Sequence, residues 1–373
     1  MQKYIHNLIL FIFIIFSVNI FADNNNWMSQ IPNDRILNQL IIPGTHNSGS
    51  YNITGFSQFS LSSDNPLPIW IEEISNILPI SLVRTIVAGW SKTQPYPITD
   101  QLNNGVRYLD FRVCNFQSHL YLCHALISVR LKDTLQQIQT FVQNNPSEII
   151  LLDINHIYNV NNSADETQLV QLLQSYLGNI AIPNSYHTSD TMGTLRQSQR
   201  NVIILMDTNQ PISDSNASQF STQYLWHQSN INSPWPNVSD IPDLKNSLDT
   251  EVAFRAKTYA SSNHFFVLQM IQTEGTDQVI DGILDPLQYP STIQNYETPL
   301  NVVLNNWLNN DITTYGQPAI NIVMQDWFTN QSPVVPLAIQ YDTQSLASNN
   351  QLQNSDLNAK LAALRHWAQG LHS

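Results

Sequence analysis

The chain has 373 residues, enough for two average domains or for one α/β barrel. Its 15 basic and 28 acidic residues give a formal net charge of -13, and we see no basic patch, so we expect no nucleic-acid partner. No Pro/Gly/Ser-rich linker divides the chain and no repeat recurs at a fixed period, so we expect one domain over residues 23–373.

Residues 1–22 have the pattern of a secretory signal peptide. Lys3 precedes the run Leu8 to Phe16, which contains no polar residue, and the small residue Ala22 ends the segment. The run is short for a membrane span, although the large Ile20 near the expected cleavage point leaves an uncleaved anchor as an alternative. We expect cleavage after Ala22 and a secreted or periplasmic protein.

The stretch IPGTHNSGSY, residues 42–51, is the most informative part of the chain. It follows the apolar residue Ile41 and places His46 where a buried strand runs into a glycine-containing turn. A histidine at such a point is held by rigid backbone and faces a cleft.

The segment from Leu67 to Trp90 is rich in Ile, Leu and Val. It has the composition of an interfacial membrane helix or of a flap over the site. Its position directly before the stretch WSKTQP (90–95) favours instead a helix that covers the barrel.

Cys114 and Cys123 bracket the sequence NFQSHLYL. A hairpin that turns at Ser118 and His119 would set the two cysteines directly opposite each other, at a distance that allows a disulfide. In an exported protein this spacing predicts a bridge rather than two free buried thiols. Two thiolates without a second pair do not make a zinc site.

Short apolar runs alternate with helical patterns along the whole chain. In the predicted helix Leu131–Gln143, apolar residues recur at helical spacing, and Asn144, Asn145 and Pro146 end it. The predicted strands are 41–42, 108–113, 149–154, 202–206, 265–271 and 320–324. This alternation predicts a parallel sheet, and at this length an α/β fold with a distorted (β/α)8 TIM-type barrel.

Polar residues that could take part in catalysis lie at or near the ends of these strands. They are His46, Asp110, Arg112, His124, Asn155 and Asp326. Barrel enzymes work at the C-terminal ends of their strands. Two histidines, acids and an arginine at that end fit phosphodiester chemistry without a bound metal.

Several of these stretches together resemble the phosphatidylinositol-specific phospholipase C X-domain family, and most closely its simple members with little besides the X domain. The resembling stretches are IPGTHNSGSY, WSKTQP, GVRYLDFRV (105–113), PSEIILLDINHIY (146–158), LWHQSNINSPWPN (225–237), FFVLQMIQT (265–273) and NIVMQDWF (321–328). One alone is weak evidence, but their order along the chain makes the resemblance specific.

The resemblance implies a role for each matching residue. His46 matches the histidine that takes the proton from the inositol 2-hydroxyl, and His124 matches the one that protonates the leaving alcohol. Each such proton transfer contributes on the order of 100- to 10,000-fold to the rate. Asp326 matches the acid that orients the base, as a buried carboxylate does when it fixes a tautomer. We therefore assign Asp326 to His46.

Arg112 stands where the resemblance separates metal-dependent from metal-independent members. The calcium-dependent signalling enzymes have an acid there, whereas the secreted bacterial enzymes have an arginine whose guanidinium neutralises the phosphate. We expect calcium-independent catalysis and no metal cofactor. Asp110 shares a strand face with Arg112 and should pair with it or accept from a catalytic group. Asn47 stands where the calcium-dependent enzymes have an asparagine that binds the ion, so calcium remains an alternative.

The headgroup pocket departs from the bacterial pattern. Asn155 and Asp207 stand near positions where the bacterial enzymes carry lysine and arginine, so the pocket has lost positive charge. We assign five residues to substrate binding: Asn47, Asp153, Asn155, Asp207 and Trp327. Trp226, Trp235 and Phe328 are candidates for stacking or for packing at the rim, and Glu148 is expected to cap an element or lie on the surface.

Together these features predict an exported, monomeric phospholipase C that cleaves phosphatidylinositol-like lipids at a membrane surface. It would form an inositol cyclic phosphate and release diacylglycerol. The alternatives are a phosphodiesterase for another lipid or for a glycosylated inositol headgroup, and an inactive protein that binds inositol phosphates or membranes.

Overall fold

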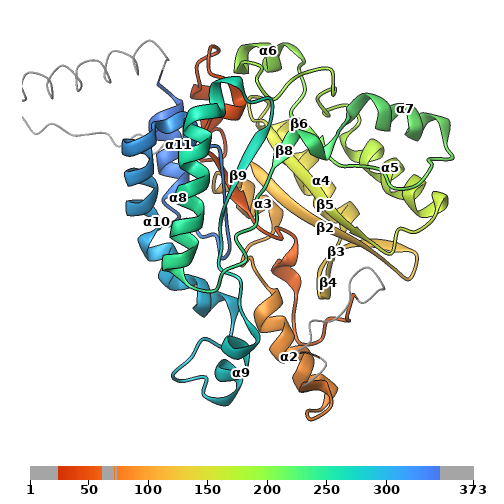
Figure 1. Cartoon of the computed structure of the whole chain (residues 1–373). Coiled ribbons are helices and arrows are strands. Elements are labelled where there is room, and N and C mark those ends of the chain that lie inside the picture. Colours follow the sequence, from red (N-terminus) through yellow and green to blue (C-terminus); the bar gives the residue numbers. More distant parts are fainter. Residues whose placement is uncertain (1–23, 61–70, 72–73, 345–373) are drawn as a thin grey trace, which may run out of the picture.

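The computed structural model describes residues 24–60, 71 and 74–344. The predicted signal peptide, residues 1–22, lies outside the described residues. Within them, one curled sheet forms the centre, with helices packed around it (Figure 1). Its main path runs β7-β6-β5-β2-β1-β10-β9-β8, and every neighbouring pair on that path is parallel.

The path has two ends, β7 and β8, and no ladder between them is present in the described part of the chain. The barrel is therefore open at one seam, which confirms the predicted α/β class and the distorted (β/α)8 barrel. The strands of the path are β1 (Ile42–Thr45), β2 (Tyr108–Phe116), β5 (Ile150–Tyr158), β6 (Val202–Leu205), β7 (Leu225–Trp226), β8 (Ile231–Asn232), β9 (Phe265–Met270) and β10 (Ile322–Gln325).

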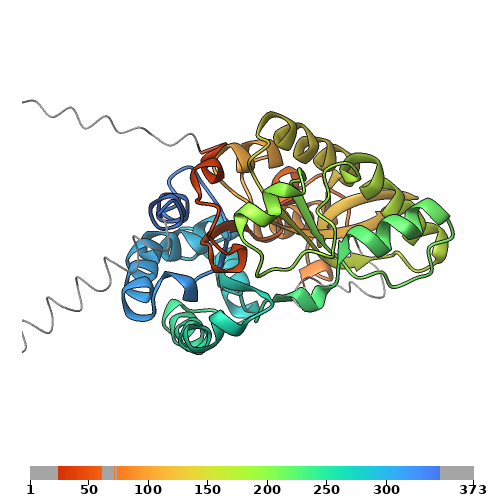
Figure 2. The same cartoon turned by 90° about the horizontal axis from the view of Figure 1, so that it is seen from above.

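Two groups of helices lie on opposite sides of the sheet, as the view from above shows (Figure 2). One group is α3 (Ile98–Asn103), α4 (Leu131–Asn144), α5 (Ser163–Leu177) and α7 (Ser215–Tyr224). The other is α8 (Ile241–Thr258), α10 (Ile293–Tyr315) and α11 (Val334–Asp342). The remaining α-helices are α2 (Ile80–Ser91), α6 (Met192–Gln197) and α9 (Thr276–Leu284), and short 3-10 turns occupy 27–30, 37–39, 50–52, 228–230, 259–261 and 317–319.

Side-chain alternation along β2 explains which residues enter the barrel. Leu109 and Phe111 belong to the apolar cluster that also contains buried residues of α3, α4 and α5. Tyr108 and Asp110 alternate with them and point to the opposite face, toward the barrel interior. The register with β5 then shifts, because Phe111 pairs with Ile154 and Arg112 pairs with His156, which leaves Asn155 as an extra residue on β5. Such a bulge re-aims side chains near active sites, and here it lies next to Arg112.

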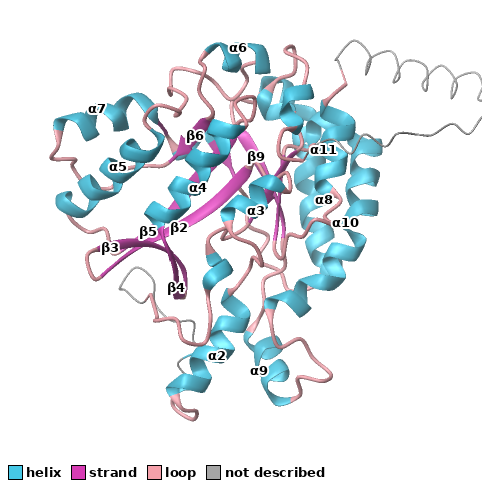
Figure 3. Ribbon diagram, turned by 180° about the vertical axis from the view of Figure 1, so that it is seen from behind, coloured by secondary structure: helices cyan, strands magenta, loops and turns pink. Residues whose placement is uncertain are grey.

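A hairpin extends the sheet beyond the barrel (Figure 3). β3 (His119–His124) runs antiparallel to β2, and β4 (Leu126–Arg130) runs antiparallel to β3. The turn falls at Gln117 and Ser118, both with positive φ, because Phe116 pairs with His119. That two-residue geometry is the favoured one for hairpins.

The predicted cysteine register is therefore wrong by two residues. Cys114 lies opposite Tyr121, and Cys123 lies diagonally from it. Both cysteines are buried free thiols in the structure. A hydrogen bond with the Cys123 thiol, and then burial, raise the pKa of Cys114 above its usual range. The disulfide itself stays a prediction.

The segment from Leu67 to Trp90 is described only in part, at residue 71 and from residue 74 onward. Its C-terminal portion is α2, whose residues Val83, Val87 and Trp90 are buried in a cluster with Val279 of α9. This buried face of α2 fits the prediction of a helix that covers the barrel. α2 and α9 also project together beyond the barrel, at the lower end in Figure 1.

Candidate active site

A cavity of about 460 Å³ opens at the C-terminal ends of the central strands. It brings together six predicted site residues: His46, Asp110, Arg112, His124, Asn155 and Asp326. They come from β1, β2, β3, β5 and β10 or from the residue that follows the strand. This is the end at which barrel enzymes hold their catalytic groups.

The turn after β1 fixes the position of His46. Asn47 adopts a positive φ of 43°, a conformation that asparagine tolerates better than most residues. Its backbone N–H donates to Asp110 Oδ2 at 2.8 Å. At Gly49, a Cβ atom would lie 2.1 Å from the Leu122 side chain on β3. Glycine is required there because the turn packs directly against the strand that carries His124.

The stretch WSKTQP holds the same turn from the other side. Thr93 Oγ1 donates to the His46 carbonyl oxygen at 2.9 Å, and Gln94 Nε2 donates to it at 3.0 Å. Trp327, after β10, donates its backbone N–H to the Thr93 carbonyl at 2.7 Å. These contacts explain why three stretches far apart in the sequence belong to one site.

The hydrogen bonds around the His46 ring define its tautomer. Asn47 Nδ2 lies 2.9 Å and an Arg112 terminal nitrogen 3.1 Å from His46 Nε2, and both groups only donate. Nε2 must therefore accept, so the ring proton is on Nδ1. Nδ1 donates to Asp326 Oδ1 at 2.8 Å. Nε2 is also the atom that meets Arg112, which lines the cavity with His46, so the accepting nitrogen is the one placed for a general base.

The ring of His124 meets a backbone carbonyl, whereas the ring of His46 meets a carboxylate. Its ring centroid lies 5.9 Å from that of His46, and its Nδ1 donates to the Ser91 carbonyl at the end of α2, at 3.0 Å. Burial and then the charge of Arg112 lower the pKa of His124 well below its ordinary value, whereas the Ser91 carbonyl opposes the shift. These surroundings therefore favour the neutral form of His124.

Asp110 does not pair with Arg112 within the described residues, so the first of its two predicted alternatives is wrong. It accepts from the Asn47 backbone and from Asn155 Nδ2, the latter at 2.7 Å, and lies 4.0 Å from His46 Nε2. Asp110 thus supports the second alternative, that it accepts from groups next to the base. The Arg112 guanidinium, half-buried beside both histidines, is free of a carboxylate partner in this part of the chain and faces the cavity.

Three further carboxyl groups gather behind and beside His46. Burial raises the pKa of Asp326, and His46 opposes that shift. Glu297 on α10 is buried, accepts from the Gln272 backbone N–H at 2.9 Å, and has a pKa raised well above its ordinary value, mainly by burial. Glu274, which lines the cavity, has its pKa raised to about 7 by burial and by repulsion from Asp326.

Three of the five residues assigned to substrate binding lie elsewhere. Asp153 is buried inside the barrel, where Tyr108 Oη donates to it at 2.6 Å and Gln228 Nε2 at 2.7 Å, and burial raises its pKa to about 6. Asp207 lines a separate hollow and contacts His227 at 3.4 Å. Trp327 packs against the apolar cluster that contains Trp90 and does not line the cavity. Each of these three residues lies on a strand or shortly after one, but none of them lines the cavity.

Two of the five remain at the site. Asn155 lines the cavity, and Asn47 contacts His46 from behind its wall without lining it. Among the four aromatic candidates, Trp235 lines the cavity and is 59% exposed, whereas Trp226 and Phe328 are buried.

The expectation for Glu148 was wrong. It is fully buried and forms an ion pair with Arg107, with Arg107 Nε 2.7 Å from its Oε2. The same carboxylate receives the Met28 backbone N–H. Glu148 therefore braces the N-terminal end of the barrel, far from the site.

A calcium site does not emerge from these residues. Within the described ranges, no group of three or more His, Cys, Asp or Glu side chains could hold a metal ion. The Asn47 Oδ1 atom is buried and has no hydrogen-bond partner there, so it supplies one orphaned oxygen at most. Calcium independence stays a prediction.

Sequence reasoning missed His156 and Glu274, both of which line the cavity. His156 follows Asn155 on β5, pairs across the sheet with Arg112, and its Nδ1 lies 2.6 Å from Asn155 Oδ1. Glu274 comes directly after the stretch FFVLQMIQT, at the end of a predicted strand. A polar residue just past a strand end was the signal that could have identified it.

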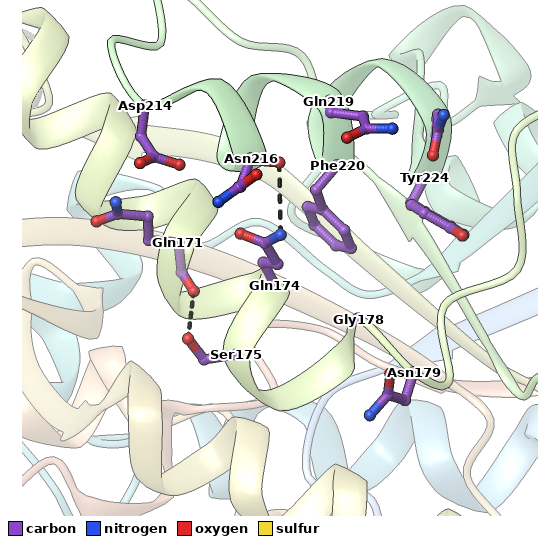
Figure 4. A pocket seen from close by; sticks show the side chains of 11 residues that line it. Gln171, Gln174, Ser175, Gly178, Asn179, Asp214, Asn216, Gln219, Phe220 and Tyr224 are labelled. Carbon is purple, nitrogen blue, oxygen red and sulfur yellow. Dashed lines mark hydrogen bonds between the residues drawn. The ribbon is translucent and has the colours of Figure 1, made fainter.

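A larger hollow of about 660 Å³ lies on the flank of the barrel, between α5 and α7 (Figure 4). Amide side chains line most of it, among them Gln174, which donates to the Asn216 carbonyl at 3.4 Å. Asp214 is its one charged lining residue. It contains no predicted site residue and no pair of groups suited to proton transfer.

Comparison with known proteins gives a consistent result. The family model described as PI-PLC X 1 matches residues 86–277. PI-PLC X domain-containing protein 2 of Homo sapiens is 31% identical over 71% of this chain and 83% of its own length. The variant-surface-glycoprotein phospholipase C of Trypanosoma cruzi is 26% identical over 76% of both chains.

The fold has solved counterparts as well. The phosphatidylinositol-specific phospholipase C from Listeria monocytogenes superposes with a TM-score of 0.57 at 17% identity. The match covers 87% of this chain and 100% of that one. At this identity the similarity concerns the fold alone.

Proposed function

Because this chain belongs to the family of proteins with a PI-PLC X domain, we propose that it is a phospholipase C-type phosphodiesterase acting on phosphatidylinositol-like lipids. The observation that carries the proposal is the pair of imidazoles 5.9 Å apart with different surroundings, His46 against a carboxylate and His124 against a carbonyl and a cation. An acid and a base in one cavity suit proton transfer at both ends of a reaction.

In the first step, His46 Nε2 takes the proton of the inositol 2-hydroxyl. That hydroxyl oxygen forms a new bond to phosphorus, and a cyclic phosphate results. The Nδ1–H donated to Asp326 keeps Nε2 available, and the carboxylate stabilises the imidazolium that forms. The substrate hydroxyl takes the place of the Asn47 or Arg112 donor that now occupies Nε2.

In the same step the bond from phosphorus to the glycerol oxygen breaks, and His124 delivers a proton to that oxygen. Diacylglycerol leaves as a neutral alcohol. Burial and the charge of Arg112 favour the neutral form of His124. A bound phosphodiester offsets the charge of Arg112, so substrate binding itself prepares the acid.

Arg112 neutralises the phosphate. A guanidinium meets two phosphate oxygens with paired donors and stays charged throughout. Its side chain carries no carboxylate partner within the described residues, so its charge is available to a ligand. This arrangement supports catalysis without calcium.

The apolar tips of α2 and α9 suit a lipid surface. Ile77, just before α2, is 80% exposed, and Ile80 at its first residue is 54% exposed. Leu284, the last residue of α9, is 77% exposed, and Leu287, in the turn after it, is 99% exposed. Side chains of this size are costly in water and insert into a membrane interface. A membrane at these tips would lie beside the cavity and supply the substrate.

Export completes the proposal. The segment 1–22 would direct the chain out of the cytoplasm and be removed after Ala22. Within the described residues, no helix has the length and apolarity needed to cross a membrane. N-terminal sequencing of the protein recovered outside the cytoplasm tests the cleavage point.

The activity is tested with a panel of vesicle lipids: phosphatidylinositol, a glycosylated phosphatidylinositol, lysolipids and phosphatidylethanolamine. Phosphorus NMR identifies the product, and we expect an inositol cyclic phosphate from the inositol lipids. Cleavage restricted to a lipid without inositol would replace the proposed substrate. Binding of inositol phosphates without any cleavage would support the inactive binder instead.

A further inference from the structure

Glu297 is a buried acid that the proposed reaction does not use. It lies on α10, one turn after Ile293, which lines the cavity. One turn further on, Asn301 Nδ2 lies 3.5 Å from the backbone carbonyl oxygen of Asp326. Since residues four apart share a helix face, this face of α10 packs behind the acid that orients His46. Glu297 therefore belongs to the surroundings of the base, although it does not line the cavity.

The carboxyl group of Glu297 is only half satisfied. Its Oε1 accepts the Gln272 backbone N–H at 2.9 Å, and the residue is 1% exposed. Its Oε2 is buried and has no hydrogen-bond partner in the described part of the chain, and the same is true of Gln272 Oε1. Both atoms are acceptors, so this part of the interior lacks a donor. A proton on Glu297 would supply one, whereas an ionised Glu297 would be a buried charge with an unpaired oxygen.

The titratable groups that face Glu297 are acids. They are Asp326, directly after β10, and Glu274, in the loop after β9. Burial, then Asp326 and Glu274, raise the pKa of Glu297 well above its ordinary value, and only a backbone hydrogen bond opposes them. Tyr296, its neighbour on α10, adds no positive charge, because burial and the charge of Glu297 raise the pKa of its phenol.

Asp326 has the partners that Glu297 lacks. It accepts from His46 Nδ1 at 2.8 Å, and His46 and Arg112 both oppose the effect of burial on its pKa. Two neighbouring buried carboxyl groups do not readily ionise together, as carboxylate dyads show. The negative charge is therefore favoured on Asp326 and the proton on Glu297.

We propose that Glu297 is a positioning residue that acts as a protonated, neutral acid, so that Asp326 alone carries the negative charge that orients His46. An ionised Glu297 would compete with Asp326 for the proton and raise the pKa of Asp326. A protonated Asp326 would no longer stabilise the imidazolium that forms on His46. The inference rests on the proposed function where it concerns turnover, but the protonation of Glu297 can be measured in the free protein.

Infrared spectroscopy tests the protonation directly. Spectra at pH 7 are compared for Glu274→Gln and for the double variant Glu274→Gln/Glu297→Gln, because the pKa of Glu274 is raised to about 7 and its own band would interfere. We expect the double variant to lose intensity in the carbonyl band of protonated carboxylic acids. Glu251→Gln in the same background, a change on the outer helix α8, should leave that band in place. Loss of carboxylate intensity at position 297 instead would overturn the proposal.

The titration of the His46 ring, followed by NMR, tests whether Glu297 carries charge beside the base. Asp326→Asn removes a carboxylate and should move the midpoint of this titration to lower pH by about one unit or more. Glu297→Gln removes no charge if Glu297 is neutral, so the midpoint should stay where it is in the wild type. A shift as large as that of Asp326→Asn would show that Glu297 is ionised, and the proposal would then be wrong.

Turnover of phosphatidylinositol tests the positioning. Glu297→Leu fills the space but removes the polar group beside Asp326, and kcat should fall by about tenfold with KM little changed. Glu297→Gln, which is neutral and can accept the Gln272 N–H, should restore most of that loss. Wild-type kcat in Glu297→Leu, or a Gln variant as poor as the Leu variant, would contradict the role of a neutral acid.

The three measurements separate this proposal from the proposed function. If Glu297→Leu does not fold, the infrared and NMR results still decide the protonation of Glu297. If the wild-type protein cleaves no inositol lipid while those two results hold, the proposed function fails and the neutral state of Glu297 stands.

Discussion

His124 and Arg112 are electrostatically coupled: after burial, the guanidinium is the largest cause that lowers the pKa of the imidazole. His46, by contrast, has Asp326 at 2.8 Å from its Nδ1. The two histidines therefore begin in different protonation environments. That difference assigns one to the base and leaves the other dependent on substrate for its proton.

This coupling predicts a pH dependence. A general acid acts in its protonated form, and kcat/KM reports the free enzyme. The pKa of His124 in the free enzyme lies below 6.5, so the protonated acid is lost as the pH rises through that pKa. The pH profile of kcat/KM should therefore have a limb that descends below pH 6.5. The negative phosphate of a bound substrate raises the pKa of His124, so the descending limb in the pH profile of kcat should lie at higher pH. Rates on phosphatidylinositol over a range of pH check this, and identical limbs above pH 7 in both profiles would refute it.

Arg112→Lys tests the source of positive charge. The lysine keeps the charge but loses the paired donors, and we expect activity to fall by about 100-fold, as for loss of a preorganised charge donor. Arg130→Lys, whose guanidinium stacks on Tyr121 away from the cavity, should act like the wild type. A chelator should leave wild-type activity nearly unchanged. Loss of activity on chelation, with recovery on added calcium, would show that calcium takes part.

The two cysteines test the predicted bridge in the exported protein. The thiols of Cys114 and Cys123 already interact, so an oxidising compartment should join them. The mass should then be lower by the two thiol hydrogens. Reduction should lower the free energy of unfolding by about 2 to 3 kcal/mol, the chain-entropy estimate for a short loop. Two alkylatable thiols in unreduced, unfolded protein would exclude the bridge.

The exposed tips of α2 and α9 predict interfacial behaviour. Ile80→Ser combined with Leu287→Ser should weaken binding to phosphatidylinositol vesicles by about tenfold or more, because each removes an exposed apolar side chain worth roughly 1.5 to 3 kcal/mol when buried. Val302→Ser, at a 75% exposed position on α10, is the matched control. Sedimentation with vesicles measures the binding. If Val302→Ser weakened binding as much as the double variant does, the result would argue against a specific membrane face.

Much of the barrel could be predicted because its strands are short apolar runs, and the six predicted strands and the helix from Leu131 agree with the structure within a few residues. The two-residue strands β7 and β8 were not predicted, because two residues are too few to show a periodic apolar pattern. The catalytic group could be assembled because strand ends meet at one edge. Asp153 and Asp207 could not be excluded from it, since depth inside a barrel and the course of a loop are tertiary properties.

The central claim, that His46 is the base and His124 the acid, is tested most directly by changing the leaving group. Rates are compared for phosphatidylinositol and for an inositol phosphodiester of p-nitrophenol, whose anion leaves without a proton. On the lipid, His46→Ala and His124→Ala should each lower kcat by about 100-fold or more, while His119→Ala, at the exposed hairpin tip, should not. On the activated ester, His124→Ala should recover most of its activity and His46→Ala should not. Equal losses on both substrates for the two variants, or recovery by His46→Ala alone, would contradict the assignment.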